Sequence, residues 1–259
     1  MNRVYMIAEA GVNHDGRLDR ALDLIDIAKA AGADAVKFQL FNAATCKGPM
    51  RSVLAPLELS KDAHRTLYVN CQALGIDYMA SCFDPEQVDF VKELGCQTLK
   101  IGSGELTNKA LLQKADASGL AVILSTGMSE RADIADALEI VFDPVLLHCV
   151  SAYPVPLEHA NLRAIQRMRK AFPVKVGFSD HTIGTQAMIA AVALGACVME
   201  KHFTYDKRAS GPDHHMSAAP AELKDYVYTL RLTEAMLGDG EKRVMPCEER
   251  VLKVARGRW

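Results

Sequence analysis

Apolar runs alternate along the chain with amphipathic stretches, and a glycine often separates the two. The stretch AKAAG ends at Gly32 before DAVKFQ, QALG ends at Gly75 before DYMASCF, and KELG ends at Gly95 before TLKIG. The pattern returns at Gly119 and Gly195. Glycine just past a helix can adopt the left-handed conformation that closes it, so each case predicts a helix end followed by a strand.

The alternation predicts eight strands and eight helices. Strands are expected at 4–10, 35–41, 77–83, 98–102, 121–125, 145–150, 174–178 and 197–203. Helices are expected near 17–31, 58–74, 85–94, 108–118, 130–141, 161–171, 184–195 and 221–237. The strands are continuous apolar runs, as in a parallel sheet covered by helices, and eight such units in about 250 residues match a closed α/β (β/α)8 TIM barrel. An open doubly wound sheet is the alternative, and the first strand lacks the GxGxxG of its dinucleotide-binding form.

Capping signals and domain limits follow from the same pattern. Asp84, followed by Pro85 and by Gln87, predicts a helix N-cap, and Ser129 is expected to cap the helix that Glu130 opens. No linker or composition break divides the chain. We therefore expect one barrel domain over 1–240 and a charged, helix-compatible tail over 241–259 that forms no second domain.

Composition excludes several classes of protein. With 49% hydrophobic and 24% charged residues the chain is globular, and its formal charge of −2 gives no global field for nucleic acid or an anionic membrane. The longest apolar run, 187–199, is too short to span a bilayer, and Glu9 interrupts the start where a signal peptide needs apolar residues. We expect a soluble, cytoplasmic protein. Its seven cysteines have no metal-binding spacing and are expected to be reduced and mostly buried.

Polar residues stand at nearly every predicted strand end, where a barrel builds its active site. They are Glu9, Asn13, His14, Lys37, Gln39, Ser81, Asp84, Lys100, Ser103, Glu105, Ser125, Thr126, His148, Ser151, Tyr153, Ser179, Asp180, His181, Glu200 and His202. A single serine after a strand is more often a helix cap. Eight polar ends converging on one face are harder to explain by packing, because unsatisfied polar groups are costly to bury.

Two lysines are the sharper signal. Lys37 in AVKFQ and Lys100 in TLKIGSGE lie within strands, where an ammonium group needs an anion. With hydroxyl groups from nearby strand ends, they would form a phosphate or carboxylate pocket, and we favour this interpretation; the hydroxyls are those of Ser103, Ser125 and Ser179. The alternative is internal ion pairing, with Glu9, Glu105 or Glu200 as partners.

Two histidines end neighbouring strands. His181 in FSDHT and His202 in EKHF follow the seventh and eighth predicted strands, so they would lie side by side at the rim. Two imidazoles with a nearby carboxylate leave positions for water and substrate, as in a catalytic divalent-metal site. The alternative is that each is a hydrogen-bonded core histidine.

Taken together, the motifs resemble the N-acetylneuraminate (sialic acid) synthase family. They are IAEAGVNHDG, AGADAVKFQ, FDPEQVDFV, KIGSGE, ILSTGM, LLHCVSAYPVP, GFSDHTIG, ALGACVMEKHFT and GPDHHMS, in order from about residue 5 to 238. Members condense phosphoenolpyruvate with an open-chain N-acetylhexosamine or related aldose. They release phosphate and form a 2-keto-3-deoxy sugar acid, so the resemblance implies a phosphoenolpyruvate-dependent transferase that forms a C–C bond.

The resemblance also implies roles for individual residues. Phosphoenolpyruvate would be held by Lys37, Ser81, Lys100, Ser103, Ser125, Ser151 and Ser179. His181 and His202 would bind Mn²⁺ or Mg²⁺, which polarises the sugar aldehyde. The sugar would contact Gln39, Tyr153 and Asp213. Glu105 would be a catalytic group for proton transfer, alongside the two histidines.

Two departures from the family concern the sugar side of the site. Typical members continue into an antifreeze-like domain that reaches the active site of a dimer partner, and the chain is expected to lack it. The segment between Gln39 and Leu59, which contains Pro49, is also shorter than in the family. The resemblance implies a homodimer, and a separate protein could supply the lid domain. The alternatives are a metal-dependent 2-keto acid aldolase or lyase, and a non-catalytic barrel that binds a sugar acid or phosphate and needs a partner domain.

Overall fold

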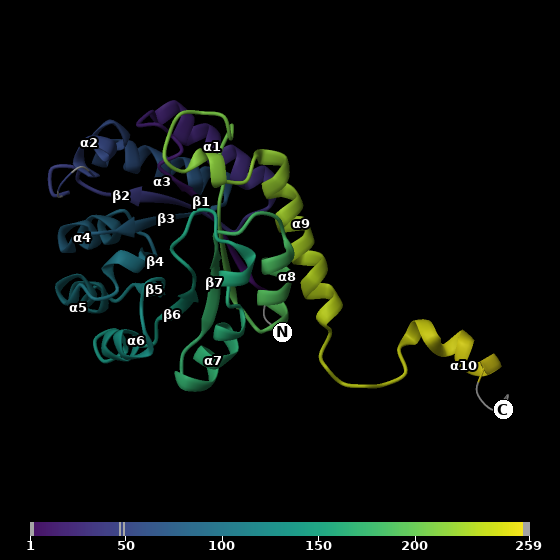
Figure 1. Ribbon diagram of the computed structural model, residues 1–259. Helices are drawn as coiled ribbons and strands as arrows, with labels where there is room; N and C mark the ends of the chain where they lie inside the picture. Colours follow the sequence, from purple (N-terminus) through teal and green to yellow (C-terminus); the bar gives the residue numbers. More distant parts are fainter. Residues whose placement is uncertain (1–2, 47, 49, 256–259) are drawn as a thin grey trace.

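Eight parallel strands close into a barrel in the order of the chain (Figure 1). The computed structural model describes residues 3–46, 48 and 50–255. The strands are β1 Tyr5–Gly11, β2 Ala35–Leu40, β3 Asp77–Cys82, β4 Thr98–Ile101, β5 Ala121–Ser125, β6 Val145–His148, β7 Val176–Asp180 and β8 Val198–His202. Each strand pairs in parallel with the next, and β8 pairs with β1. The predicted (β/α)8 barrel is confirmed.

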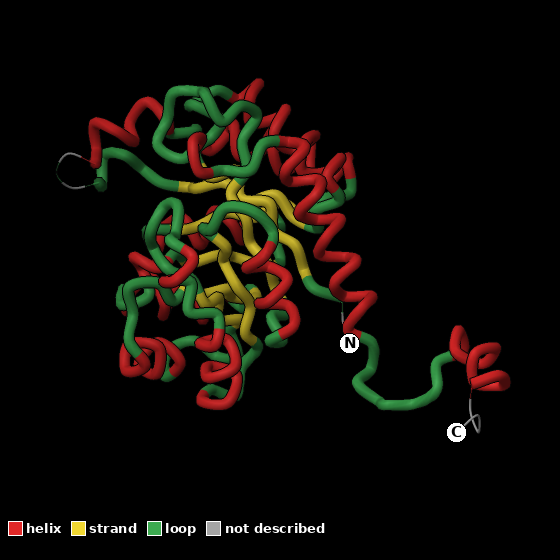
Figure 2. Tube along the Cα trace, turned by 45° about the vertical axis from the view of Figure 1, so that its right-hand side comes forward, coloured by secondary structure: helices red, strands yellow, loops and turns green. Residues whose placement is uncertain are grey.

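Helices surround this barrel, as Figure 2 shows with the strands at the centre. The main helices are α1 Leu18–Ala31, α3 Lys61–Leu74, α4 Pro85–Glu93, α5 Lys109–Ser118, α6 Arg131–Leu138, α7 Arg163–Ala171, α8 Gln186–Ala193 and α9 Pro220–Leu237. Shorter elements lie in loops: α2 Met50–Leu54, η1 Ala55–Leu57, η2 Ser103–Glu105, η3 Leu157–His159 and η4 His214–Met216. Pro49, which belongs to the short predicted loop, lies outside the described residues.

Inside the barrel, an apolar layer lies beneath a polar one. Ile7, Ala35, Met79, Ile123, Leu147 and Val198 form a buried cluster. Successive residues of a strand alternate in direction, so the residue two positions further on faces the same interior. Those positions hold Glu9, Lys37, Ser81, Ser125, Cys149 and Glu200, all buried. The strand register therefore stacks a polar layer on an apolar floor at the carboxyl end of the barrel.

The capping predictions had mixed outcomes. Asp84 is the N-cap of α4, and Gln87 Oε1 accepts a hydrogen bond from its N–H at 3.1 Å. The prediction for Ser129 was wrong, because Glu130 is the N-cap of α6. The Glu130 N–H donates to Asp133 Oδ2 at 2.7 Å, whereas the Ser129 hydroxyl donates to the Gly127 carbonyl oxygen. The acidic pair Glu130 and Asp133, which begins one residue later and has longer side chains at the cap, therefore caps α6 in place of Ser129.

Beyond α9 the chain leaves the barrel (Figure 1) and forms η5 Pro246–Glu248 and α10 Glu249–Ala255. Residues 256–259 of the predicted tail lie outside the described part. All seven cysteines are free, and four of them, Cys71, Cys82, Cys96 and Cys149, are buried. Over the described residues, no helix is both long enough and apolar enough to cross a membrane.

Candidate active site

Four buried charged groups lie in the polar layer of the barrel. Lys37 Nζ lies 2.7 Å from Glu9 Oε2 and 3.5 Å from Glu200 Oε2. Lys100 Nζ lies 3.8 Å from Glu200 Oε1. The internal ion pairs that the sequence left as the alternative are therefore present, with Glu9 and Glu200 as partners. With Glu9 ionised, two cations and two anions balance each other, which is what allows charges to stay inside a barrel.

Serine hydroxyls complete the coordination of the two ammonium groups. Lys37 Nζ donates to Ser81 Oγ at 2.9 Å, and Lys100 Nζ donates to Ser125 Oγ at 2.7 Å. The Ser179 hydroxyl donates to Glu200 Oε1 at 2.8 Å. Five of the residues predicted to hold phosphoenolpyruvate, Lys37, Ser81, Lys100, Ser125 and Ser179, are thus brought into one connected network.

The two carboxyl groups of this network differ in acidity. Burial raises the pKa of Glu9 to about 7, and the attraction of Lys37 offsets this only in part. Burial acts in the same direction on Glu200, but Lys100 and Lys37 outweigh it and lower its pKa to about 2. Glu200 is therefore an anion at neutral pH, while Glu9 is poised to take up or release a proton.

A second cluster of hydroxyl groups surrounds Gly127. A Cβ atom at this glycine would lie 2.4 Å from Ser151 Oγ, 2.9 Å from Ser103 Oγ and 3.1 Å from Cys149 Sγ. The Gly127 N–H donates to Ser103 Oγ at 3.0 Å. Ser151 Oγ is buried and has no hydrogen-bond partner in the described part of the chain. We call this group of three residues around Gly127 the serine cradle; it leaves a hydroxyl free to bind an oxygen anion.

His181 and His202 lie next to each other, with ring centroids 5.6 Å apart. The Tyr153 ring lies 4.3 Å from that of His181. His181 Nδ1 is 2.8 Å from the Val150 carbonyl oxygen, which can only accept, so Nδ1 carries the hydrogen and Nε2 keeps its lone pair. Burial lowers the pKa of both imidazoles, so both are neutral at pH 7.

The pair fits a divalent cation in its donor chemistry. His202 Nδ1 is buried without a hydrogen-bond partner among the described residues, and Asp213 Oδ2 lies 3.9 Å away. Neutral imidazole nitrogens with free lone pairs are the form that ligates metals. Within residues 3–46, 48 and 50–255, however, no three His, Cys, Asp or Glu side chains converge as a complete ligand set. Two protein ligands would leave the other positions to water and substrate.

Two of the three residues predicted to contact the sugar, Gln39 and Asp213, lie around Gly11. A Cβ there would lie 3.4 Å from Asp213 Oδ2, 3.4 Å from Glu9 Oε1 and 3.5 Å from Gln39 Nε2. Tyr153 stands half-exposed above the histidines. Glu105 lies apart from this group: its Oε2 accepts a hydrogen bond from Asn108 Nδ2 at 2.7 Å, and no described contact joins it to the lysines or histidines.

The sequence placed Glu9 and Glu200 among the polar strand ends of the expected site, but it gave them no role beyond pairing with the lysines. Their position two residues beyond Ile7 and Val198 would have placed both inside the barrel.

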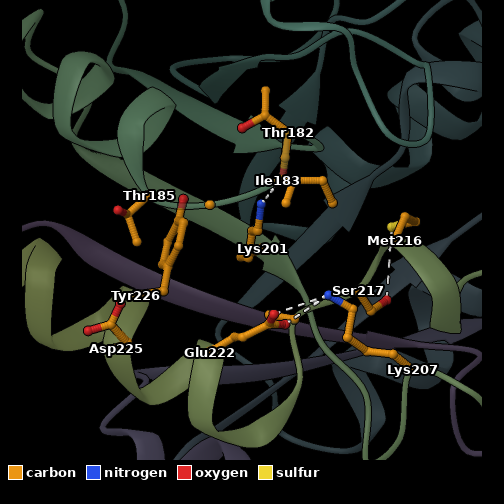
Figure 3. A pocket seen from close by; sticks show the side chains of 12 residues that line it. Thr182, Ile183, Thr185, Lys201, Lys207, Met216, Ser217, Glu222, Asp225 and Tyr226 are labelled. Carbon is orange, nitrogen blue, oxygen red and sulfur yellow. Dashed lines mark hydrogen bonds and ion pairs between the residues drawn. The ribbon is translucent and has the colours of Figure 1, made fainter.

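A buried polar network behind β7 and β8 was also missed, and Figure 3 shows three of its residues, Thr182, Lys201 and Tyr226. The Tyr226 hydroxyl, from α9, donates to Asp180 Oδ2 at 2.9 Å, and Asp180 Oδ1 accepts from the Thr182 N–H at 2.9 Å. Lys201 Nζ donates to the Thr182 carbonyl oxygen, beside a cavity of about 140 Å³. His181 lies between Asp180 and Thr182, so α9 fixes the turn that carries it.

Comparisons with known proteins agree with this geometry. Residues 24–242 match the NeuB family. The chain is similar to the N,N'-diacetyllegionaminic acid synthase of Campylobacter jejuni, with 41% identity over 99% of this chain and 84% of the relative. It is 38% identical to the human N-acetylneuraminate-9-phosphate synthase, over 94% of this chain and 74% of the relative. The crystal structure of the N-acetylneuraminic acid synthetase from Leptospira borgpetersenii in complex with citrate superimposes with a TM-score of 0.92 at 37% identity, covering 97% of this chain and 91% of that one.

Proposed function

The chain belongs to the NeuB family, and on this premise we propose that it is a sugar-acid synthase. The reaction joins phosphoenolpyruvate to an open-chain aldose of the N-acetylhexosamine type. C3 of phosphoenolpyruvate bonds to the aldehyde carbon, water adds at C2, and phosphate leaves with its bridging oxygen as the C–O bond breaks. The product is a 2-keto-3-deoxy sugar acid.

One observation carries this proposal: two buried lysines are hydrogen-bonded to serine hydroxyls in the polar layer of the barrel, where carboxylates balance their charge. Lys37 and Lys100 are held rigid by Glu9 and Glu200, so they need no reorganisation when an anion arrives above them. The phosphate and carboxylate of phosphoenolpyruvate carry charge throughout the reaction. Both lysines therefore contribute to binding more than to rate.

The serine cradle is assigned to the phosphate group. Hydroxyls of Ser103 and Ser151 converge where Gly127 has no side chain, and the unpartnered Ser151 Oγ can donate to a phosphate oxygen. Any side chain at residue 127 would occupy this space. Residue 127 must therefore be glycine, so that the space remains open for the anion.

His181 and His202 would hold a divalent cation, Mn²⁺ or Mg²⁺, which when bound would act as a Lewis acid toward the aldehyde oxygen. Both histidines are kept neutral by burial, and His181 is oriented by the Val150 carbonyl oxygen and by the network behind β7.

Gln39, Tyr153 and Asp213 would position the sugar. Glu105 remains our candidate for proton transfer, and Glu9, with a pKa of about 7, is a second carboxyl group able to hold a proton beside Gln39 and Asp213.

A pair of histidine variants tests the proposal. We expect His202→Ala to lose Mn²⁺ binding, measured by calorimetry, and to lose phosphate release from phosphoenolpyruvate while keeping the folded circular dichroism spectrum. The matched control is His159→Ala in η3, where the histidine is exposed and both measurements should match wild type. Near-normal turnover and metal affinity in His202→Ala would sink the assignment.

A further inference from the structure

An open groove of about 1360 Å³ runs between α6 and α7, outside the polar layer of the barrel. One end is lined by residues that follow β5 and β6, including Thr126, Cys149 and Ser151. The other end runs down the side of α7 to Phe172. Because Ser151 also belongs to the serine cradle, the groove joins the outer surface of the molecule to that cradle.

Four basic side chains line this groove. Arg163, Arg167 and Lys170 stand four and three residues apart on α7, a spacing that places them on one face of a helix, and Arg131 lines the groove from α6. All four are exposed, and no ion pair involving them occurs in the described residues. One acidic residue, Glu130, the N-cap of α6, lines the same groove.

The groove thus carries an excess of three positive charges on a chain whose formal net charge is −2. Basic clefts concentrate anions near a surface and raise their rate of arrival, an effect that salt screens.

We propose that this groove is an outer binding site for a phosphate-bearing anion that leads to and from the serine cradle. Arg131, Arg163, Arg167 and Lys170 hold the phosphate group first, and Ser151 takes it over at the inner end. The ligand chemistry is that of a phosphate monoester or of free orthophosphate. The choice of phosphoenolpyruvate as the monoester rests on the proposed function, whereas anion binding by the groove does not.

The test compares two double variants of the full chain that each lose two positive charges. Arg163→Gln/Arg167→Gln removes half of the basic lining. The matched control, Lys242→Gln/Arg250→Gln, changes exposed basic residues of the segment beyond α9, which line none of the described pockets. Glutamine keeps a polar, uncharged side chain, and all four positions are exposed, so both proteins should fold. Thermal unfolding of both variants tests this.

The first readout is the salt dependence of kcat/KM for phosphoenolpyruvate. Removing two charges at about 10 Å from a ligand of charge about −3 should lower kcat/KM roughly tenfold at low ionic strength and about threefold or less at 0.15 M salt. We expect kcat to stay within about twofold of wild type, since neither Arg163 nor Arg167 belongs to the serine cradle or to the polar layer of the barrel. The second readout is direct binding of phosphoenolpyruvate and of inorganic phosphate by calorimetry at low salt.

The outcomes separate the two ligand sources and the two proposals. Weaker phosphoenolpyruvate binding in the groove variant alone supports an access route for the substrate, and weaker inorganic phosphate binding with reduced product inhibition supports an exit route. Equal affinities, salt slopes and kcat/KM in both double variants would overturn the groove proposal. Absence of turnover in the wild-type protein would count against the synthase, while the binding titrations would still decide whether the groove binds anions.

Discussion

Replacing Glu200 by glutamine should destabilise the protein strongly, although the change removes only one charge and keeps the side-chain shape. Glu200 faces both buried lysines, with Oε2 at 3.5 Å from Lys37 Nζ and Oε1 at 3.8 Å from Lys100 Nζ. Glutamine can still accept the hydrogen bond of Ser179. The variant therefore leaves two buried ammonium groups facing one carboxylate.

The magnitude follows from the acidity of the group. Folding lowers the pKa of Glu200 from 4.5 to about 2, because the attraction of Lys100 and Lys37 exceeds the effect of burial. At about 1.4 kcal/mol per pKa unit, the ionised form stabilises the fold by about 3 kcal/mol. Since the pKa is lowered, this contribution is present above pH 4.5 and is lost as the pH falls toward about 2. Breaking a buried pair costs about 3–5 kcal/mol, so we expect a loss in that range at pH 7.

Urea unfolding at pH 7 measures this loss, and Glu222→Gln is the matched control. Glu222 pairs with Lys207 at 3.0 Å, but the pair is exposed, so the same chemical change should cost less than about 1 kcal/mol. Equal losses in the two variants, or a loss below about 1 kcal/mol in Glu200→Gln, would show that the charged layer does not hold the barrel in the way we describe.

Three further outcomes are expected. Gly127→Ala should weaken phosphoenolpyruvate binding more than about tenfold, because its Cβ would lie 2.4 Å from a serine oxygen. The control Gly104→Ala, with nothing within 4 Å of its Cβ, should bind phosphoenolpyruvate normally. Equal affinities in the two variants would refute the role of the serine cradle. Burial lowers the pKa of His64 from 6.5 to about 4, so the unfolded state binds more protons than the folded state between these pH values. The free energy of unfolding should therefore fall by about 3 kcal/mol as the pH drops from 6.5 to 4. His64→Leu should make the free energy of unfolding less dependent on pH in this range, and an unchanged slope would contradict the shift. Tyr226→Phe should reduce Mn²⁺ affinity about tenfold through the loss of its bond to Asp180, at a stability cost of about 1–2 kcal/mol; unchanged metal affinity would make that network purely structural.

The sequence predicted the barrel because glycine-ended helices and apolar strands are local signals. All eight strands and all eight main helices lie within a few residues of their expected bounds, with differences at the ends where one capping side chain competes with its neighbour, as at Ser129 and Glu130. Those competitions depend on the rotamers of adjacent residues, which a pattern of residue types does not contain.

The site was predictable in its membership and less so in its connections. Lys37, Lys100, His181 and His202 could be chosen because charged or imidazole groups inside apolar strands need partners. Which partner each takes depends on the strand register, which sets Glu9 beside Lys37 and Ser179 beside Glu200. The contact of α9 with the turn that holds His181 is longer-ranged still, and only the folded chain reveals it.

Coupling between phosphoenolpyruvate consumption and phosphate release tests the central claim most directly. The measurement follows phosphoenolpyruvate, orthophosphate and new 2-keto acid together, with Mn²⁺ and a panel of aldoses that includes N-acetylmannosamine, and with a chelator control. We expect equimolar loss of phosphoenolpyruvate, release of phosphate and formation of a sugar acid, dependent on one aldose and on the metal. Formation or cleavage of a 2-keto acid without phosphate release would make the protein an aldolase or lyase. Binding of phosphoenolpyruvate without any turnover across the panel would contradict the synthase and leave a barrel that only binds.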